Sequence, residues 1–317
     1  MSPRARVFAA VGAAAVAVAG GTVGIAWLQA RGPAANAVHP RAGVPPLFFD
    51  FGVRNDAEAR SLAQGAQLLK AGKRSEAGAV FERFHSLQAQ IGQTFAKWPD
   101  LSAVESLAAH HEDSAVMRLH LGLALLWAGR DGDALTTLQE VSSRFPDSQS
   151  AVDAEDLLYA RDIPGLPYII VPATIPTAPT LARQVVLAAR AAARPDAQAK
   201  LAYGLMLWRL DRRVSARREF AAAARLAPND PDVLTALGVS RFTKANPTPA
   251  FASLGPLTGR FPKAAVVRFH LGLLLLWTRQ VGKGTRQLRT VAKSQPDSLY
   301  GKEAQKLLSA LVPNGTK

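Results

Sequence analysis

A 34-residue repeat in the second half of this 317-residue chain limits the folds that the chain can adopt. Glycine recurs at this spacing, and a proline follows each of these glycines 24 residues later. Each unit contains two stretches of helical apolar periodicity, separated by a short polar break and closed by the proline. Such a unit cannot bury its own apolar face, so it must stack on its neighbours. The recurring residues are Gly204, Gly238 and Gly272, with Pro228, Pro262 and Pro296.

Other positions keep the same register in the units that begin at 197, 231 and 265. A small residue occupies one position, and apolar residues occupy two later positions. A unit at 115–148 and a first unit that runs through Gly65 and Phe81 follow the same scheme. The aligned residues are Ala216, Ala250 and Gly284, then Phe220, Leu254 and Leu288, then Ala223, Leu257 and Val291.

This pattern resembles the tetratricopeptide repeat family over most of residues 57–308. The family places a glycine early in its first helix (helix A), small residues at the helix contact, and a proline at the end of its second helix (helix B). The resemblance implies an all-α, tetratricopeptide-type α-solenoid of helix–turn–helix repeats, in which a polar helix at 298–310 caps the stack. The family's early tryptophan is missing, and its place is taken by Arg118, Lys200, Leu234 and Arg268.

A longer repeat is superimposed on the 34-residue one. The sequence AVMRLHLGLALLW at 115–127 returns as AVVRFHLGLLLLW at 265–277, an offset of 150 residues. This agreement indicates that a block of several repeats was duplicated. It also places His120 and His270 at the same position of helix A, which predicts a shared packing or hydrogen-bonding role for the two side chains.

A proline-rich stretch interrupts the repeats. The sequence IPGLPYIIVPATIPTAPT at 163–180 contains five prolines, which forbid a helix there. It separates helices expected at 149–160 and 180–193. The stretch is either an interdomain linker or a long loop within one superhelix, and the helical register after residue 180 favours the superhelix. Residues 84–112 also break the strict spacing, so one irregular repeat is expected there.

Residues 7–28 form an uncharged apolar run that is long enough to cross a membrane. At about 1.5 Å per residue, a helix of this length spans roughly 33 Å. An uncleaved signal anchor is favoured, because the run exceeds the apolar region of about 7–15 residues in a cleaved signal peptide. Gly20 and Gly24 have the spacing that lets two membrane helices pack as a homodimer, although an Ala/Gly-rich segment also contains such pairs by chance.

Residues 29–55 have the prolines and glycines of an extended spacer, within which the apolar stretch LFFDF at 47–51 is expected to dock onto the folded part. The expected organisation is a flank at 1–6, a transmembrane anchor at 7–28, a spacer at 29–55, an N-terminal repeat block at 56–160, a Pro-rich insertion at 161–179, a C-terminal repeat block with its capping helix at 180–311, and a tail at 312–317.

Composition and motifs exclude several kinds of chemistry. The chain has no cysteine, which excludes a disulfide framework, a Cys-ligated metal and a thiol nucleophile. The sequence contains no GxSxG, HExxH, P-loop or GxGxxG motif. Its one dense polar cluster, His110 to Asp113, has the character of a solvated repeat junction. We therefore expect no catalytic residue, no metal and no cofactor.

The formal net charge of +14 is unevenly distributed. Residues 1–178 carry 15 Lys+Arg and 17 Asp+Glu, whereas residues 179–317 carry 23 and 7. The excess basic residues map to helix B and its preceding turn, on the outer face. Aromatic residues are not interleaved with them, so nucleic-acid binding is not indicated. This face is either simply solvated or binds an anionic polymer or lipid head groups.

The family resemblance implies that helix A lines the concave surface of the solenoid, and here that surface is unusually apolar. It is either an open groove for another protein, bound as a helix or an extended segment, or it is buried between repeats or beneath the 47–51 stretch. The candidate partner-binding residues are Leu119, Leu123, Trp127, Leu201, Leu205, Trp208, Arg209, Val239, Phe242, Phe269, Leu273 and Trp277.

These observations predict a non-catalytic, membrane-tethered scaffold that binds a protein partner through the concave surface. A basic module that binds an anionic polymer or lipid head groups is the alternative. We expect a single-pass protein of the cell membrane, similar to membrane-anchored bacterial repeat proteins, with its repeats on the outer side. Cleavage of the signal would instead give a secreted protein.

Overall fold

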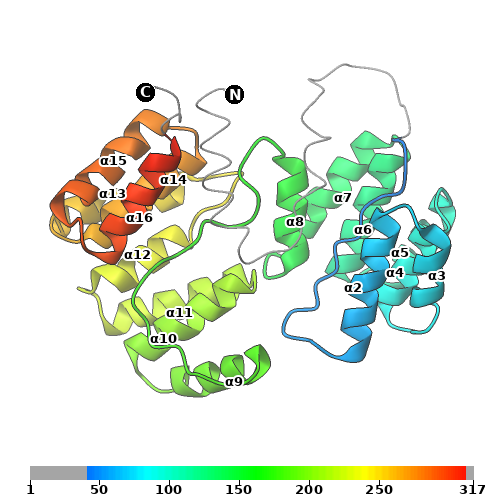
Figure 1. Ribbon diagram of the computed structural model, residues 1–317, viewed down its shortest axis with the longest axis horizontal. Helices are drawn as coiled ribbons and strands as arrows, with labels where there is room; N and C mark the ends of the chain where they lie inside the picture. Colours follow the sequence, from blue (N-terminus) through cyan, green and yellow to red (C-terminus); the bar gives the residue numbers. More distant parts are fainter. Residues whose placement is uncertain (1–40, 312–317) are drawn as a thin grey trace. The chain divides into compact units, whose positions relative to one another are not determined.

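The computed structural model describes residues 41–311, which contain fifteen α-helices and no β-strand (Figure 1). The described residues form two compact units, divided between residues 160 and 161. We call residues 41–160 the N-terminal unit and residues 161–311 the C-terminal unit.

The N-terminal unit contains three helix pairs and one further helix. The first helix of each pair starts at a polar side chain, Asp56, Ser86 or Ser114, which accepts a hydrogen bond from a first-turn backbone N–H. The pairs are α2 (Ala57–Lys70) with α3 (Arg74–Phe81), α4 (Leu87–Ala96) with α5 (Leu101–His110), and α6 (Ala115–Trp127) with α7 (Asp131–Arg144), followed by α8 (Gln149–Leu158).

The C-terminal unit repeats this plan with one helix added at its start. The pairs again follow one another through short turns, and a single helix again closes the unit. The helices are α9 (Leu181–Ala192), α10 (Ala197–Arg209) with α11 (Arg213–Leu226), α12 (Pro231–Val239) with α13 (Thr248–Arg260), α14 (Ala265–Trp277) with α15 (Val281–Ser294), and α16 (Leu299–Leu311).

The first helices of successive pairs form a continuous layer in each unit. Helix α4 packs on α2 and α6, and α6 packs on α8; likewise α12 packs on α10 and α14, and α14 packs on α16. We call these eight helices the A helices, and the surface that they form in each unit its A-helix face. This arrangement confirms the predicted all-α fold of tetratricopeptide-like helical repeats.

The glycine early in the A helix is required by a close helix contact. A Cβ atom added at Gly204 would lie 2.6 Å from the ring of Phe220, and one added at Gly65 would lie 2.5 Å from the ring of Phe81. Both phenylalanines belong to the second helix of the same pair and are completely buried. The recurring glycine therefore makes room for the large side chain that recurs sixteen residues later.

The internal duplication is also visible in the helix boundaries. Helices α14 and α15 begin and end 150 residues after α6 and α7, and α16 begins 150 residues after α8. Residues between α8 and α9 contain no helix, as their prolines predict. Helices α4 and α5 occupy the region where the irregular repeat was expected, and each has ten residues.

Several expectations concern residues that the structure does not describe. The apolar run at 7–28, the Gly20 and Gly24 pair within it, and the tail at 312–317 all lie outside residues 41–311. Within residues 41–311, no helix combines the length and the apolar character needed to cross a membrane. The predicted transmembrane anchor and its homodimer contact therefore stay predictions.

Candidate functional site

Each unit holds an extended segment of its own chain against its A helices. In the N-terminal unit this segment is residues 41–51, which we call the N-strap. In the C-terminal unit it is residues 163–173, the C-strap. Neither strap contains helix or strand. In Figure 1 they are the blue segment before α2 and the green segment between α8 and α9.

His120 on α6 is completely buried and binds the N-strap. Its Nε2 atom accepts a hydrogen bond of 3.0 Å from the backbone N–H of Phe48. Its Nδ1 atom lies 2.6 Å from the carbonyl oxygen of Val116, one helical turn earlier. Since a carbonyl can only accept, we assign the ring proton to Nδ1, which leaves the Nε2 lone pair for the strap.

His270 on α14 makes the same contacts with the C-strap. It is also completely buried. Its Nε2 atom accepts a hydrogen bond of 2.9 Å from the backbone N–H of Ile170, and its Nδ1 atom lies 2.7 Å from the carbonyl oxygen of Val266. The shared hydrogen-bonding role that the sequence predicts for His120 and His270 is therefore confirmed.

Burial keeps both imidazoles neutral. It lowers the pKa of His120 and that of His270 to about 4, against a smaller opposing effect of the hydrogen bond to the carbonyl. A proton on Nε2 would face the strap N–H, donor against donor. Each histidine is consequently a fixed acceptor for one backbone N–H of its strap.

The two straps also share a sequence pattern, with an offset of 122 residues. In both straps the pattern begins with a glycine at positive φ, 84° at Gly43 and 78° at Gly165. Two residues later each has a buried proline, and three residues after that proline comes the N–H donor. The aligned pairs are Gly43 with Gly165, Val44 with Leu166, Pro45 with Pro167, Leu47 with Ile169, Phe48 with Ile170, and Phe49 with Val171.

Additional contacts hold the N-strap. The backbone N–H of Arg41 donates to the carbonyl oxygen of Trp127 at 2.8 Å, and the guanidinium carbon lies 5.3 Å from the centre of the Trp127 ring. The ring of Phe49 meets Phe81 edge-on with centres 6.3 Å apart. These contacts confirm that the apolar stretch 47–51 docks onto the folded part.

The C-strap has an anchor of its own. The indole Nε1 of Trp208 donates to the carbonyl oxygen of Pro167 at 2.7 Å. Ile169 and Val171 are buried, with 8% and 9% of their surface exposed. Burial also raises the pKa of the Tyr168 hydroxyl, with a further contribution from Glu303. The C-strap is therefore part of the core of its unit.

The duplicated tryptophans leave one polar atom each without a partner. The indole Nε1 atoms of Trp127 and Trp277 are buried, and no acceptor for either lies within residues 41–311. These two residues are equivalent in the duplication. The unsatisfied donor is therefore a shared property of the two A-helix faces rather than an accident of one.

The predicted partner-binding residues do not form an open surface. Ten of the twelve are buried, Trp127 is half-buried, and only Arg209 is exposed. Leu119 and Leu123 lie in a cluster against which Phe48 packs, and Trp208 lies beneath Pro167. The buried residues are Leu119, Leu123, Leu201, Leu205, Trp208, Val239, Phe242, Phe269, Leu273 and Trp277. The structure thus shows these residues buried and not lining an open groove. Their role in partner binding stays a prediction.

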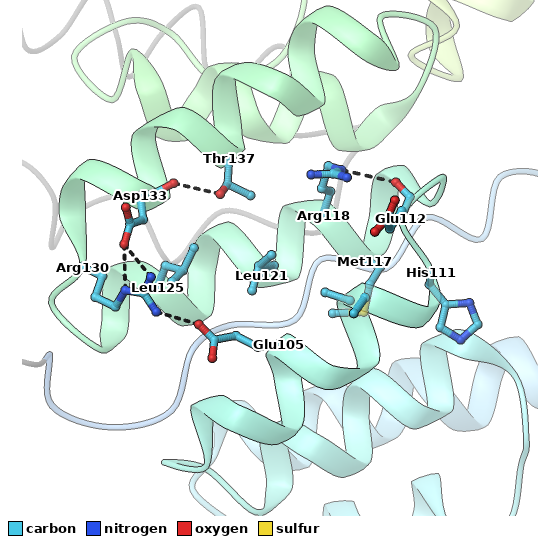
Figure 2. Close-up of a pocket in the computed structure, with 12 residues that line it drawn as sticks. Glu105, His111, Glu112, Met117, Arg118, Leu121, Leu125, Arg130, Asp133 and Thr137 are labelled. Atoms are coloured by element: carbon cyan, nitrogen blue, oxygen red, sulfur yellow. Dashed lines mark hydrogen bonds and ion pairs between the residues drawn. The ribbon is translucent and has the colours of Figure 1, made fainter.

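A pocket of about 340 Å³ lies apart from the straps, between α5 and the α6–α7 pair. Figure 2 shows Arg130 at one end, where its guanidinium contacts Glu105 at 2.6 Å and Asp133 at 2.7 Å. At the other end, Arg118 donates to the backbone carbonyl of Glu112 and pairs with Glu140 at 2.7 Å. Arg118 and Arg130 are paired with carboxylates, so these two cations offer no unpaired positive charge to an anionic ligand.

The histidine cluster lies at the end of α5. His110 is exposed, and its Nδ1 lies 2.7 Å from the carbonyl oxygen of Ser106. His111 lines the pocket of Figure 2, with its ring directed away from Arg118. Within residues 41–311, no group of three or more His, Asp and Glu side chains is placed to hold a metal ion.

Comparison with known proteins finds solved structures of low similarity. No protein-family model matches the chain, and neither does any curated protein sequence. The structure of yeast Tom70 is similar with 16% identity and a TM-score of 0.37, over 85% of this chain and 53% of that one. The C-terminal part of a TPR repeat-containing protein from Cytophaga hutchinsonii has 14% identity and a TM-score of 0.24, over 80% and 96%. The chain thus spans about half the length of the Tom70 chain.

Proposed function

We propose that the chain is a non-catalytic scaffold that binds a protein partner through the A-helix faces of its repeats. The observation that supports this function is that both faces already hold an extended apolar segment. In each case a buried histidine accepts a backbone N–H, and apolar side chains pack on the helices. A surface with this chemistry suits an extended segment of another protein.

Salt dependence provides the test. Cross-linking the intact chain in its membrane would identify neighbouring proteins, and binding of each purified neighbour would be measured at about 0.15 M and 0.5 M salt. Apolar contacts persist at the higher salt concentration, whereas contacts between exposed charges are screened. We expect Trp127→Ala to weaken binding and Leu135→Ala, at an exposed leucine on α7, to leave it unchanged. Loss of binding in 0.5 M salt would contradict the apolar contact.

The proposal includes a membrane tether. Residues 7–28 would hold the protein in the cell membrane as a single-pass anchor, with the repeats on the outer side, and would raise the local concentration of a partner. Extraction of membranes at high pH and sequencing of the mature N-terminus test this part. A protein that stays in the membrane with residues 7–28 attached supports the anchor, and release of a shortened chain supports secretion.

One observation favours the alternative, an anionic ligand for the basic outer face. Helix α15 carries a stripe of exposed cations at helical spacing and contains no acidic residue. Its duplicate α7 carries Asp131, Asp133 and Glu140 instead. The α15 stripe consists of Lys283, Arg286, Arg289 and Lys293.

This alternative has a direct test with lipid vesicles. Co-sedimentation of the chain with vesicles of anionic lipid should fall with salt and with the double change Lys283→Glu and Arg286→Glu. Lys302→Glu on α16 changes an exposed charge outside the stripe and serves as the control. Equal binding to neutral vesicles would contradict recognition by charge.

A further inference from the structure

Comparison of the two straps identifies what the A-helix face recognises. Residues 43–49 and 165–171 are identical at only two of seven positions, the glycine and the proline. Both segments nevertheless give their histidine a backbone N–H at the same position and pack apolar side chains on the helices. Because the backbone makes the shared polar contact, the face recognises a pattern of residue types rather than one sequence.

Three positions of this pattern have a physical reason. The glycine takes a positive φ that other residues adopt at a cost. The buried proline has no N–H, so it enters the site without an unpaired donor. An aliphatic residue and then a bulky apolar residue follow, and the bulky residue donates its N–H to the histidine. The pattern is therefore Gly-aliphatic-Pro-any-aliphatic-bulky apolar.

The apolar side chains of the N-strap are less buried than those of the C-strap. Leu47, Phe48 and Phe49 of the N-strap are only half-buried, whereas Ile169 and Val171 of the C-strap are buried. Gly204 on α10 and Gly65 on α2 are the recurring A-helix glycines, and the residue four positions later differs between the units. The C-terminal unit has Trp208 there, whose indole donates to the C-strap, and the N-terminal unit has Leu69, which has no side-chain donor.

The connection between the N-strap and α2 also allows the strap to leave its site. Residues 52–56 are all exposed, and Gly52 adopts a positive φ of 54°. The N-strap is thus the one whose departure uncovers fewer buried residues.

We infer that the A-helix face of the N-terminal unit is a binding site for an extended partner segment with the pattern Gly-aliphatic-Pro-any-aliphatic-bulky apolar, and that the N-strap occupies this site until such a segment replaces it. The inference rests on the proposed function and adds the partner's chemistry and its regulation. A strap on a short tether has an effective concentration of about a millimolar, so the intact chain binds such a segment weakly.

Labelled peptides test the inference on the full chain. The probes are fluorescent peptides of residues 41–51 and 163–173, titrated against the intact chain and against a released chain that carries Leu47→Asp and Phe49→Asp. We expect both peptides to bind the released chain, and to bind it at least about tenfold more tightly than they bind the intact chain. Failure of both peptides to bind a released chain that retains its helical circular dichroism would overturn the inference.

Two changes isolate the histidine contact. A 41–51 peptide with an N-methyl group on the Phe48 amide lacks the donor and keeps every side chain, and we expect it to bind about tenfold more weakly. In the released chain, His120→Leu should weaken binding similarly. His270→Leu is the matched control, because it alters the same contact in the other unit. Equal weakening by the two histidine changes would contradict binding at the N-terminal unit.

If the released chain does not fold, the peptide-binding test uses a second preparation of the protein. A specific protease sequence inserted at exposed Val53 allows the folded chain to be cut after the strap, so that the strap exchanges with added peptide. We expect the peptides to displace the cut strap. A cut chain that keeps its strap against millimolar peptide would overturn the inference.

Sedimentation of the intact chain distinguishes a site for a partner segment from a site for the strap of a second copy. We expect no dimer that forms through the N-strap, because each chain fills its own site. A dimer that the 41–51 peptide dissociates would mean that two copies exchange their N-straps, which would overturn the inference of a partner segment. Salt-resistant capture of a partner by a chain that binds no strap peptide would refute this inference and leave the proposed function standing.

Discussion

The backbone N–H of Phe48 and the Nε2 atom of His120 form a hydrogen bond of 3.0 Å although the two residues are 72 positions apart. Ile170 and His270 repeat this bond at 2.9 Å across 100 positions. Both imidazoles are completely buried, so a polar atom left unpaired here would keep its desolvation cost. The two bonds therefore fix which strap residue lies against which turn of the A helix.

Removing the acceptor should destabilise the fold. We expect His120→Leu and His270→Leu each to lower the free energy of unfolding by about 1–3 kcal/mol, because each leaves a strap N–H unpaired. Urea unfolding followed by circular dichroism measures the loss. The exposed His110 provides a control, and His110→Leu should change the free energy by less than about 0.5 kcal/mol. Equal effects of the three changes would argue against a specific role for the buried rings.

Acid should weaken the fold in a defined window. The pKa of both buried histidines is about 4 in the folded chain, below the ordinary value of 6.5. The unfolded chain therefore binds more protons between these values, and the free energy of unfolding falls as the pH drops from about 6.5 to 4. Each histidine contributes up to roughly 3 kcal/mol to that loss, and the full stability is present above pH 6.5.

The pH prediction is checked by urea unfolding at pH 7, 5.5 and 4.5. A chain with His120→Gln and His270→Gln lacks both titrating groups and keeps possible acceptors at both sites. We expect its stability to fall less steeply over this range than that of the unaltered chain. The same slope in both chains would show that other groups cause the pH dependence.

Two glycines on helices should respond oppositely to alanine. At Gly204 the added methyl group would lie 2.6 Å from Phe220, so Gly204→Ala should lower the free energy of unfolding by about 1–3 kcal/mol. At Gly282 on α15 nothing lies within 4 Å of the added atom, so Gly282→Ala should raise it by about 0.5–1 kcal/mol. Thermal unfolding compares the two chains, and stabilisation by Gly204→Ala would contradict the packing described here.

Two buried tryptophans form another matched pair. Trp208→Phe removes the donor to the Pro167 carbonyl, whereas Trp277→Phe removes a donor that has no acceptor within residues 41–311. Both changes lose similar ring volume, so their difference reports the hydrogen bond. We expect Trp208→Phe to cost about 1 kcal/mol more. The free energies of unfolding in urea give the difference, and a larger loss for Trp277→Phe would refute this account of the C-strap.

Helical periodicity and repeat spacing were sufficient to predict the fold. The helices expected at 149–160 and 180–193 correspond to α8 (Gln149–Leu158) and α9 (Leu181–Ala192). The glycine spacing works because it reflects a physical contact, the approach of Gly204 to Phe220. The same reasoning found that His120 and His270 share a role, since the residues around them are duplicated.

The straps could not be predicted in the same way. An extended segment has no helical periodicity, and prolines such as Pro45 and Pro167 are equally frequent in linkers. The shared pattern is short, and its offset of 122 differs from the 150 of the helices because α9 and other insertions lie between the C-strap and α14. The sequence therefore predicted the apolar residues of the A helices. It did not predict which strap forms a hydrogen bond with which histidine.

Hydrogen exchange at the amides of Phe48 and Ile170 tests most directly the claim that each A-helix face binds an extended segment of the chain. Both N–H groups are bonded to a buried imidazole, although neither lies in a helix or a strand. We predict that both exchange at least about a hundredfold more slowly, relative to their intrinsic rates, than the amide of exposed Val53. Exchange of Phe48 and Ile170 at the rate of Val53 would mean that the straps are not bound, and would contradict the account.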